Sequence, residues 1–309
     1  MSSDDASFSS TWAGLPLLGG LSSRSQDLAP SILFALAFAA LVPLAVLRIG
    51  NRATRTSLLY RIVAAVVLRV ATYSLRAVEA TGEMKRGMRT AEQILLLTAP
   101  SLLYEPLLPL LRYHVRRNWI PSVPSSQETT KVTWLERALY VLWLTAWASL
   151  VLGIVAGSEA YSASTAKLKR YRYAGIALTL LILGLSLLIC GAMHVRERLP
   201  ARGTAFLLAC NGLLVVPTLY RLISTLSPPA PTSAAGKAVF YILFSAPELL
   251  VALLWFVVDL QRMFRVREGE WKEVVERKMR KGRWEGEFVG REEWELREKE
   301  RSDAKEEDV

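Results

Sequence analysis

The sequence contains few of the side chains that build metal centres, disulfides and catalytic triads. Its 309 residues include only two cysteines and two histidines. Cys190 and Cys210 both fall inside long apolar segments, so a disulfide framework is not expected, and metal-ligand spacing is absent. His114 and His194 lie at the ends of such segments and cannot assemble a Ser/His/Asp triad. From these residues we expect neither a metal site nor a cofactor.

Several well-known catalytic and nucleotide-binding motifs are also missing. The chain has no G-x-x-x-x-G-K-[ST] loop, no H-E-x-x-H pair and no G-x-S-x-G turn. The first absence excludes an ATP-driven pump built from this chain alone. The last apolar segment has no lysine near its middle, which excludes a retinal Schiff base there. We therefore expect that the protein is not an enzyme.

Long apolar runs dominate what is present. The chain is 52% hydrophobic, and its mean hydropathy is +0.27. Between residues 28 and 260 the apolar runs are roughly 20 residues long, the length that crosses a bilayer as a helix. This pattern predicts an all-α fold, a polytopic bundle of seven transmembrane helices. The predicted spans are 28–48, 57–79, 90–112, 135–157, 173–194, 203–226 and 238–260.

Charged residues divide the chain into three parts and predict its orientation. Residues 1–27 form an N-terminal tail, 28–260 the membrane domain and 261–309 a charged C-terminal tail. The net charge of +10 is concentrated in short loops and just after the last span, which indicates membrane surfaces rather than nucleic acid. Eight Lys and Arg residues between 261 and 281 favour a cytosolic C-terminus. Seven spans then place the N-terminus outside, in the plasma membrane or an endomembrane.

The C-terminal tail contains a pattern typical of a helix on a membrane surface. Trp271, Val274, Val275 and Met279 recur at helical spacing, and basic residues surround them. The pattern predicts a short amphipathic helix on the inner leaflet, where anionic lipid attracts the basic side chains. A solvated helix is the alternative. The remaining charged segment is expected to be a frayed helix or disordered.

Three arginines lie inside the second predicted span, where charge is costly. Arg61, Arg69 and Arg76 fall within an arc of about 80° on one helical face. Such a face is expected to point into the bundle. Arg61 and Arg76 lie near the two ends of the span and are expected to snorkel to an interface or to serve structure. Arg69 lies near the midplane, where an arginine costs roughly 2.5 to 3.5 kcal/mol, so it needs a partner.

Few acidic residues lie at a suitable depth to be that partner. By depth, Arg69 can pair with Glu248 or with Glu105, and Arg61 can pair with Glu105 or with Asp259. Arg221, in the outer part of the sixth span, can face Glu248 one helix away. Asn211 and Thr145 can bridge helices. Prolines place bends beside the two most buried acids, at Pro100 to Pro109 around Glu105 and at Pro247 before Glu248.

Two interpretations of these polar residues remain open. They form either a polar site for a charged or amphiphilic ligand or an ion-pair network that fixes the register of the helices. The candidate residues are Arg69, Arg76, Glu105, Asn211, Arg221 and Glu248.

Several segments together resemble a known group of fungal membrane proteins. They are "YEPLLPLLRY" in the third span, "LYRLI" in the sixth and "FYILFSAPELLVALLWFVVD" in the seventh, together with the second-span arginines. The chain is similar here, over about residues 28 to 265, to the lipid-translocating exporter-like family, which is linked to aminocholesterol resistance and sphingoid-base release. The family usually has R-x-x-E late in the sixth span, whereas "YRLISTLSP" lacks the acid. This departure favours a sister group with a domain of unknown function.

The resemblance and the polar residues together suggest a function. The resemblance implies lipid handling, with Arg221, Phe240, Tyr241 and Glu248 at family positions. We expect the protein to bind or translocate an amphiphilic, lipid-like molecule through a polar cavity lined by the second, third, sixth and seventh spans. Its arginines would meet an anionic headgroup. The alternatives are a seven-helix sensor that signals through its tail and a structural organiser of the membrane. The expected partners are membrane lipids and such a ligand, with anionic inner-leaflet lipid at the tail and no nucleic acid.

Overall fold

A computed structural model describes residues 17–51, 54–82, 86–119, 126–161, 164–197, 199–227, 233–264 and 266. All regular structure in these ranges is helical, and seven helical spans are long and apolar enough to cross a membrane. The predicted all-α, seven-span architecture is therefore confirmed, including the arginine-bearing second span, and the chain is an integral membrane protein. The spans are Arg24–Gly50, Ser57–Ala80, Gly87–Val115, Trp134–Ser158, Ala166–Arg196, Ala201–Leu226 and Ala234–Val257.

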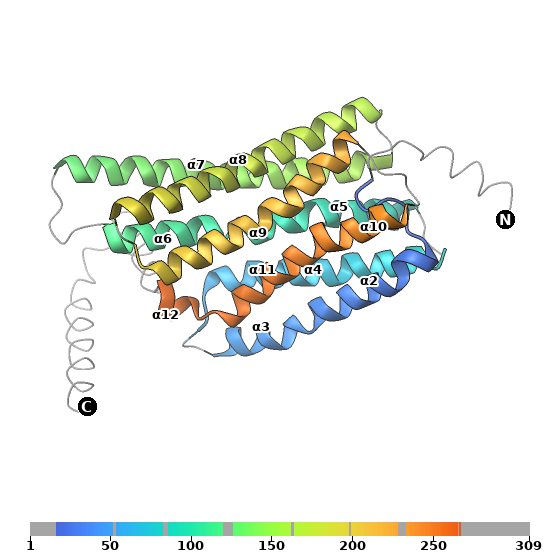
Figure 1. Cartoon of the computed structure of the whole chain (residues 1–309), viewed down its shortest axis with the longest axis horizontal. Helices are drawn as coiled ribbons and strands as arrows, with labels where there is room; N and C mark the ends of the chain where they lie inside the picture. Colours follow the sequence, from blue (N-terminus) through green and yellow to red (C-terminus); the bar gives the residue numbers. More distant parts are fainter. Residues whose placement is uncertain are drawn as a thin grey trace, which may run out of the picture. The chain divides into compact units, whose positions relative to one another are not determined.

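Three of the seven spans consist of more than one helical element (Figure 1). The first span is α2 (Arg24–Ala39) and α3 (Leu41–Gly50), the third is α5 (Arg86–Tyr104) and α6 (Leu107–Trp119), and the seventh is α10 (Ala234–Phe240), η2 (Tyr241–Ser245) and α11 (Ala246–Val257). The remaining elements are α4 (Ser57–Ala80), α7 (Ser126–Ser158), η1 (Glu159–Tyr161), α8 (Thr165–Glu197), α9 (Ala201–Leu226) and α12 (Leu260–Phe264).

Prolines explain where the spans are interrupted, because proline has no N–H to donate to the preceding turn. The first span turns at Ala40, three residues before Pro43, and the third turns at Glu105 and Pro106. In the seventh, the π-helix η2 ends at Ser245, two residues before Pro247. Pro217 instead lies within a continuous α9. Two of the three interruptions therefore adjoin acidic residues of the membrane domain, as the sequence predicted.

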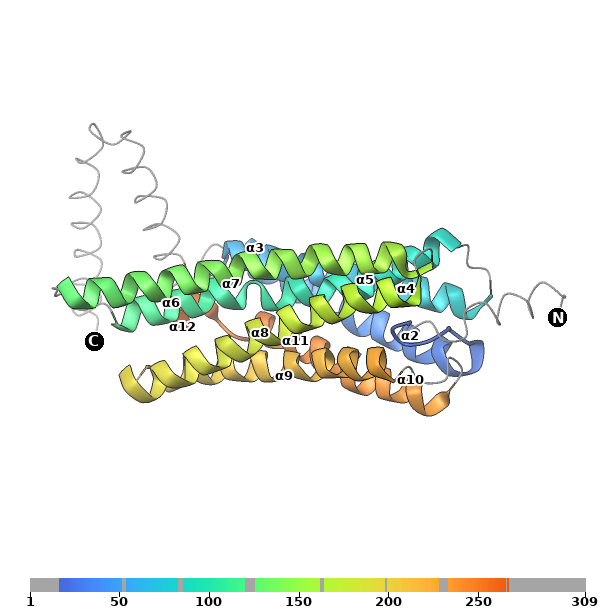
Figure 2. The same ribbon diagram turned by 90° about the horizontal axis from the view of Figure 1, so that it is seen from above.

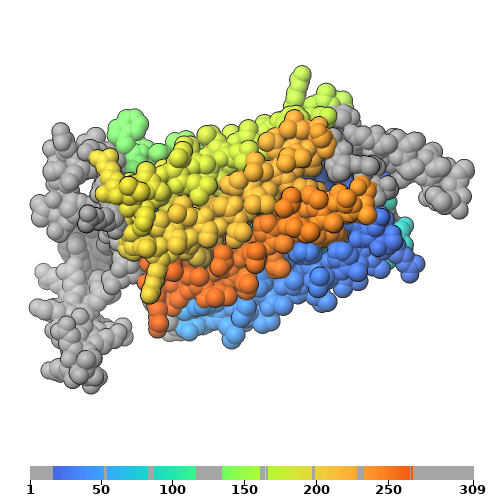
Figure 3. All heavy atoms as spheres, in the orientation of Figure 1, coloured from blue at the N-terminus to red at the C-terminus, as the bar shows by residue number. Residues whose placement is uncertain are grey.

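The spans pack side by side, and the third span is the most enclosed. Helix α4 packs between α2 and α5, α5 packs on α7, and α7, α8 and α9 follow in order. The seventh span then packs on α9 and contacts α3 and α4. Figures 1 and 2 show the spans running along one common axis, and Figure 3 shows α8, α9, the seventh span and α2–α3 as neighbouring stripes on one face. In the third span 78% of the most apolar window is buried, against 17% in the first.

Small residues permit one close helix contact that our sequence interpretation missed. Gly153 and Gly157, four residues apart on α7, face α5. A Cβ at Gly157 would lie 2.6 Å from the Cα of Ile94, and one at Gly153 would lie 3.0 Å from the carbonyl oxygen of Leu97. The backbones of α5 and α7 therefore approach as closely as the small-xxx-small pattern allows in membranes.

Both ends of the membrane domain differ slightly from the predicted boundaries. Helix α2 begins at Arg24, so it includes residues that we assigned to the N-terminal tail. At the other end, the compact unit that contains the bundle ends at Phe264. The predicted amphipathic helix at 271–279 and the charged segment after it lie outside the described residues.

Candidate functional site

The three arginines of α4 lie at three depths, and each has an acidic partner. Arg61 contacts Glu105 at the break between α5 and α6. Arg69 contacts Glu248 on α11. Arg76 contacts Asp27 in the first turn of α2, at the end of the bundle that we call the N-terminal end. The face that the sequence predicted therefore turns toward polar groups of three other spans.

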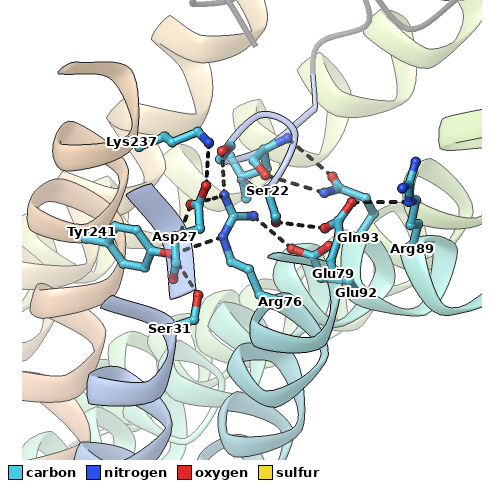
Figure 4. Close-up of polar contacts among 12 residues, drawn as sticks. Ser22, Asp27, Ser31, Arg76, Glu79, Arg89, Glu92, Gln93, Lys237 and Tyr241 are labelled. Carbon is cyan, nitrogen blue, oxygen red and sulfur yellow. Dashed lines mark hydrogen bonds and ion pairs between the residues drawn. The ribbon is translucent and has the colours of Figure 1, made fainter. Parts of the chain in front are cut away.

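Arg76 is the centre of a dense polar network, which we call the end cluster and which consists of Asp27, Arg76, Glu79, Arg89, Glu92, Lys237 and Tyr241 (Figure 4). Its Nη1 donates to Glu92 at 2.8 Å, and its Nη2 donates to Asp27 at 3.0 Å. Its Nε donates to the hydroxyl of Tyr241 at 3.1 Å. All three nitrogens of this fully buried guanidinium are therefore hydrogen-bonded.

Asp27 connects Arg76 to the seventh span. Its Oδ2 accepts from the Nζ of Lys237 and, at 2.9 Å, from the backbone N–H of Ser23. Its Oδ1 accepts from the hydroxyl of Tyr241 at 3.1 Å. The hydroxyls of Tyr241 and Ser31 lie 2.8 Å apart. A single carboxylate on α2 is thus bonded to α4 and to both α10 and η2.

A short strap, residues 17–23, covers the end cluster. The carbonyl oxygen of Gly19 accepts from Arg76 Nη2 at 2.5 Å, and the side-chain amide of Gln93 bonds the N–H and the carbonyl of Leu18 at 3.3 and 3.4 Å. The hydroxyl of Ser22 donates to Glu79 at 2.8 Å. Leu18 is almost fully buried. Residues 17–23 are therefore part of the bundle and enclose Arg76.

The charges of the end cluster balance. Its three cations are Arg76, Arg89 and Lys237, and its three carboxylates are Asp27, Glu79 and Glu92. Arg89 Nε lies 3.3 Å from Glu79, so each cation has a carboxylate within ion-pair distance. A balanced, hydrogen-bonded network is the arrangement in which buried charges are tolerated.

The structure corrects our prediction that Arg76 snorkels to the interface. Side chains on a helix tilt toward its N-terminus, and Arg76 lies close to the C-terminal end of α4, which begins at Ser57. The side chain of Arg76 is therefore directed into the bundle, where it is 0% exposed. The same tilt directs Arg61 toward its own nearby end, and the Arg61 side chain is 38% exposed. The interpretation of Arg76 as structural agrees with its network of bonds.

The second network lies near the middle of the membrane domain, and we call it the central cluster: Arg69, Tyr73, Arg221, Ser245 and Glu248. Arg69 Nη2 lies 2.5 Å from Glu248 Oε2, and both side chains are 0% exposed. The two groups form an ion pair, although the angles at this contact depart from ideal hydrogen-bond geometry. The guanidinium also lies over the ring of Phe244, 5.0 Å from its centroid. Arg69 pairs with Glu248, one of the two partners that depth allowed.

The polar contacts around this pair are fewer and less regular than those of Arg76. Apart from their contact with each other, Arg69 and Glu248 have no well-aligned hydrogen bond to any residue that the structure describes. The hydroxyls of Tyr73 and Ser245, which are close to each other, also lack one of acceptable geometry. Buried polar groups normally have partners, so an unsatisfied group requires an explanation.

Arg221 adds a second, uncompensated cation. Its residue is 5% exposed, and its Nε is enclosed without a hydrogen bond. It interacts electrostatically with Glu248 and Arg69, but it forms no ion pair with any acid in the described ranges. Two arginines therefore share one carboxylate in this part of the membrane domain. The tilt of α9 side chains directs Arg221 toward the middle of the bundle, away from its nearer end.

Glu105 and Asn211 belong to neither cluster. Glu105 accepts from Arg61 Nη1 at 2.6 Å and also accepts from the indole N–H of Trp143, so it links α4 and α7 at the break in the third span. Asn211 donates to the carbonyl oxygen of Leu207 in its own helix at 2.8 Å. Thr145 likewise bonds the carbonyl of Val141 within α7. The prediction that Asn211 and Thr145 bridge helices through these groups is therefore wrong.

The candidate residues thus lie in different parts of the structure. Arg69, Arg221 and Glu248 come together, Arg76 lies in the end cluster, and Glu105 and Asn211 lie apart. Comparison of the sequence with models of known protein families finds no match, and comparison with curated proteins finds no significantly similar sequence. The proposed function therefore depends on the geometry of the two clusters.

Proposed function

We propose that this integral membrane protein binds and translocates an amphiphilic, lipid-like molecule, whose polar headgroup contacts the central cluster. The supporting observation is the fully buried pair of Arg69 and Glu248, beside which lies a second buried arginine, Arg221, with no ion pair to any acid in the described ranges. A pair that served structure alone would not need this additional cation, and around Arg76 the cations and carboxylates are equal in number. Buried ionisable residues at membrane depth typically mark substrate pathways.

The proposal is tested by lipid flux in proteoliposomes that contain the purified protein. The assay follows a fluorescent lipid analogue with a short labelled chain and expresses the rate per amount of folded protein. Arg69→Leu and Glu248→Gln should each abolish flux, whereas Arg61→Gln, which removes a partly exposed arginine of the same helix, should leave it unchanged. Equal flux in all variants would contradict the proposal.

A charge exchange separates this function from a purely structural role. The double variant Arg69→Glu, Glu248→Arg keeps the ion pair but reverses it. If each single variant removes folded protein and the double variant restores both folding and flux, the pair only holds helices together. Loss of a signalling output on removal of the tail from residue 268, with flux unchanged, would instead favour the sensor that we considered from the sequence.

We further propose that the C-terminus faces the cytosol and that the basic tail contacts anionic lipid of the inner leaflet. The support is the eight basic residues between 261 and 281, together with the odd number of spans. The resemblance to fungal lipid-translocating exporter-like proteins fits this orientation and the proposed function. Accessibility of cysteines introduced at residues 10 and 300 to an impermeant reagent in intact cells tests the orientation.

A further inference from the structure

We infer that Arg221 is the docking group for a single negative charge on an amphiphile that reaches it from the bilayer, and that Glu248 is the internal anion with which this charge competes. The inference rests on the proposed function and specifies the chemistry of the ligand. It starts from the charge of the central cluster, where two arginines share one carboxylate.

The first step is that Arg221 lacks the ion-paired acid that a buried arginine normally has. The residue is more than nine-tenths buried, and its Nε makes no hydrogen bond. Glu248, the acid that interacts with it, is in ion-pair contact with Arg69 instead. A buried arginine without an anion is costly, because desolvation is not offset by a nearby opposite charge. A ligand anion at Arg221 would bring the cluster from one excess positive charge to neutrality.

The second step concerns the direction from which such an anion can arrive. Leu219 and Ile223, each two residues from Arg221, are 43% and 60% exposed and mark the lipid-facing side of α9, about 160° around the helix from Arg221. Ile242 is 64% exposed on η2, which packs against α9. We place the entry of the anion between α9 and η2, with its acyl chain beside Ile242 and its headgroup at Arg221. This entry favours a chain-bearing anion from the membrane over a free one.

The third step explains why the ligand should carry one charge rather than none or two. A neutral headgroup would leave Arg221 uncompensated, and a dianion would leave the cluster negative in a medium that solvates charge poorly. A carboxylate or a singly charged phosphodiester restores balance. If this anion also approached Arg69, it would compete with Glu248, whose ion pair among the described residues is with Arg69.

The experiment measures binding to the full chain in nanodiscs of zwitterionic phosphatidylcholine. The probes are oleate, oleyl alcohol with the same chain but no charge, and acetate with the same charge but no chain. Oleate should bind, and both other probes should bind at least tenfold more weakly. Arg221→Gln should weaken oleate binding at least tenfold, and Arg221→Lys should retain an intermediate affinity. The control Arg61→Gln, which removes the same charge outside the cluster, should bind oleate as the unmodified protein does.

A second measurement keeps the inference falsifiable if a variant folds poorly. Because Glu248 is already in ion-pair contact with Arg69, Arg221→Leu should melt at the same temperature as the unmodified protein or higher when no oleate is present. A lower melting temperature would show that Arg221 serves structure and would overturn the inference, as would equal binding of oleate and oleyl alcohol. If Arg221→Gln loses oleate binding but keeps lipid flux, the anion site stands and the proposed function fails. If flux depends on Arg69 and Glu248 but oleate does not bind, the proposed function stands and the anion site at Arg221 fails.

Discussion

Arg69 and Arg76 lie seven residues apart on one face of the same helix, and both are completely buried, yet their surroundings differ. Arg76 uses all three guanidinium nitrogens in hydrogen bonds, within a cluster of three cations and three carboxylates. Arg69 contacts one carboxylate, has no well-aligned hydrogen bond to any other described residue and shares its partner with Arg221. The comparison indicates that a membrane protein can provide a hydrogen bond for every nitrogen of a buried arginine. Burial in a membrane therefore does not by itself explain the sparse contacts of Arg69.

The largest expected effect is at the end cluster. Arg76→Met leaves Asp27 and Glu92 enclosed without their main cation, and breaking a buried ion pair on one side costs about 3–5 kcal/mol. Purified Arg76→Met should therefore yield little folded protein and melt at a much lower temperature in detergent. Arg61→Met, which removes a partly exposed arginine from the same helix, is the matched control. Equal melting temperatures of the two variants would contradict the expected contribution of the end cluster to stability.

The central cluster should respond unequally to the loss of its two paired residues. Glu248→Gln leaves two buried arginines without an acid, so we expect a loss near the lower end of the same range, about 3 kcal/mol. Arg69→Leu leaves Glu248 with Arg221 as a neutralising cation, and its cost should be nearer about 1 kcal/mol, that of an ordinary substitution. Melting temperatures of the two variants, measured side by side, check the order. The opposite order would mean that Arg221 does not compensate Glu248.

A smaller effect tests whether the strap belongs to the end cluster. Gly19 has a φ of +77°, and a Cβ there would lie 2.9 Å from both Nη atoms of Arg76, which are held by their own bonds. Gly82 has a φ of +91° with nothing within 4 Å, so Gly82→Ala carries only the backbone cost of about 1–2 kcal/mol. Gly19→Ala should melt at a lower temperature than Gly82→Ala. Equal melting temperatures of the two variants would show that the strap does not depend on its contact with Arg76.

The smallest effect is expected at Asn211, which belongs to neither cluster. Its amide bonds only its own helix in the described part of the chain, so Asn211→Leu removes no contact between spans. The free energy of unfolding should change by at most about 0.5 kcal/mol, as for substitutions away from special features. Lipid flux should be unchanged. A large loss of either property would place Asn211 among the functional residues after all.

Hydropathy predicted the seven spans, but it concealed two members of the end cluster. The predicted first and seventh spans start at 28 and 238, directly after Asp27 and Lys237. A charge lowers the mean hydropathy of any window that contains it, so a boundary drawn by hydropathy stops beside the charge. In the structure both residues lie inside helices, in ion-pair contact with each other. Oppositely charged residues at the edges of two predicted spans are therefore a signal of a buried pair.

The pairing of the α4 arginines was only partly predictable. Helical periodicity placed Arg61, Arg69 and Arg76 on one face, and depth reduced the partners of Arg69 to Glu248 and Glu105. The choice between those two depends on how the third and seventh spans rotate about their axes, and the breaks beside Pro106 and Pro247 change that rotation. The sequence also contained no sign of the strap, because its contacts use the backbone of Leu18 and Gly19.

The π-helical turn η2 determines where the seventh span tolerates the loss of a residue. In η2 the N–H of Ala246 donates to the carbonyl of Tyr241, five residues back, so this turn holds one residue more than an α-helical turn. Deletion of Leu243 would remove this extra residue and allow a continuous α-helix, so the residues beyond it would keep nearly the same orientation and Glu248 would still face Arg69. Deletion of Ala252, within the α-helical α11, would instead rotate Trp255 and Phe256 by about 100° relative to Glu248. A one-residue deletion should therefore be better tolerated in η2 than in α11.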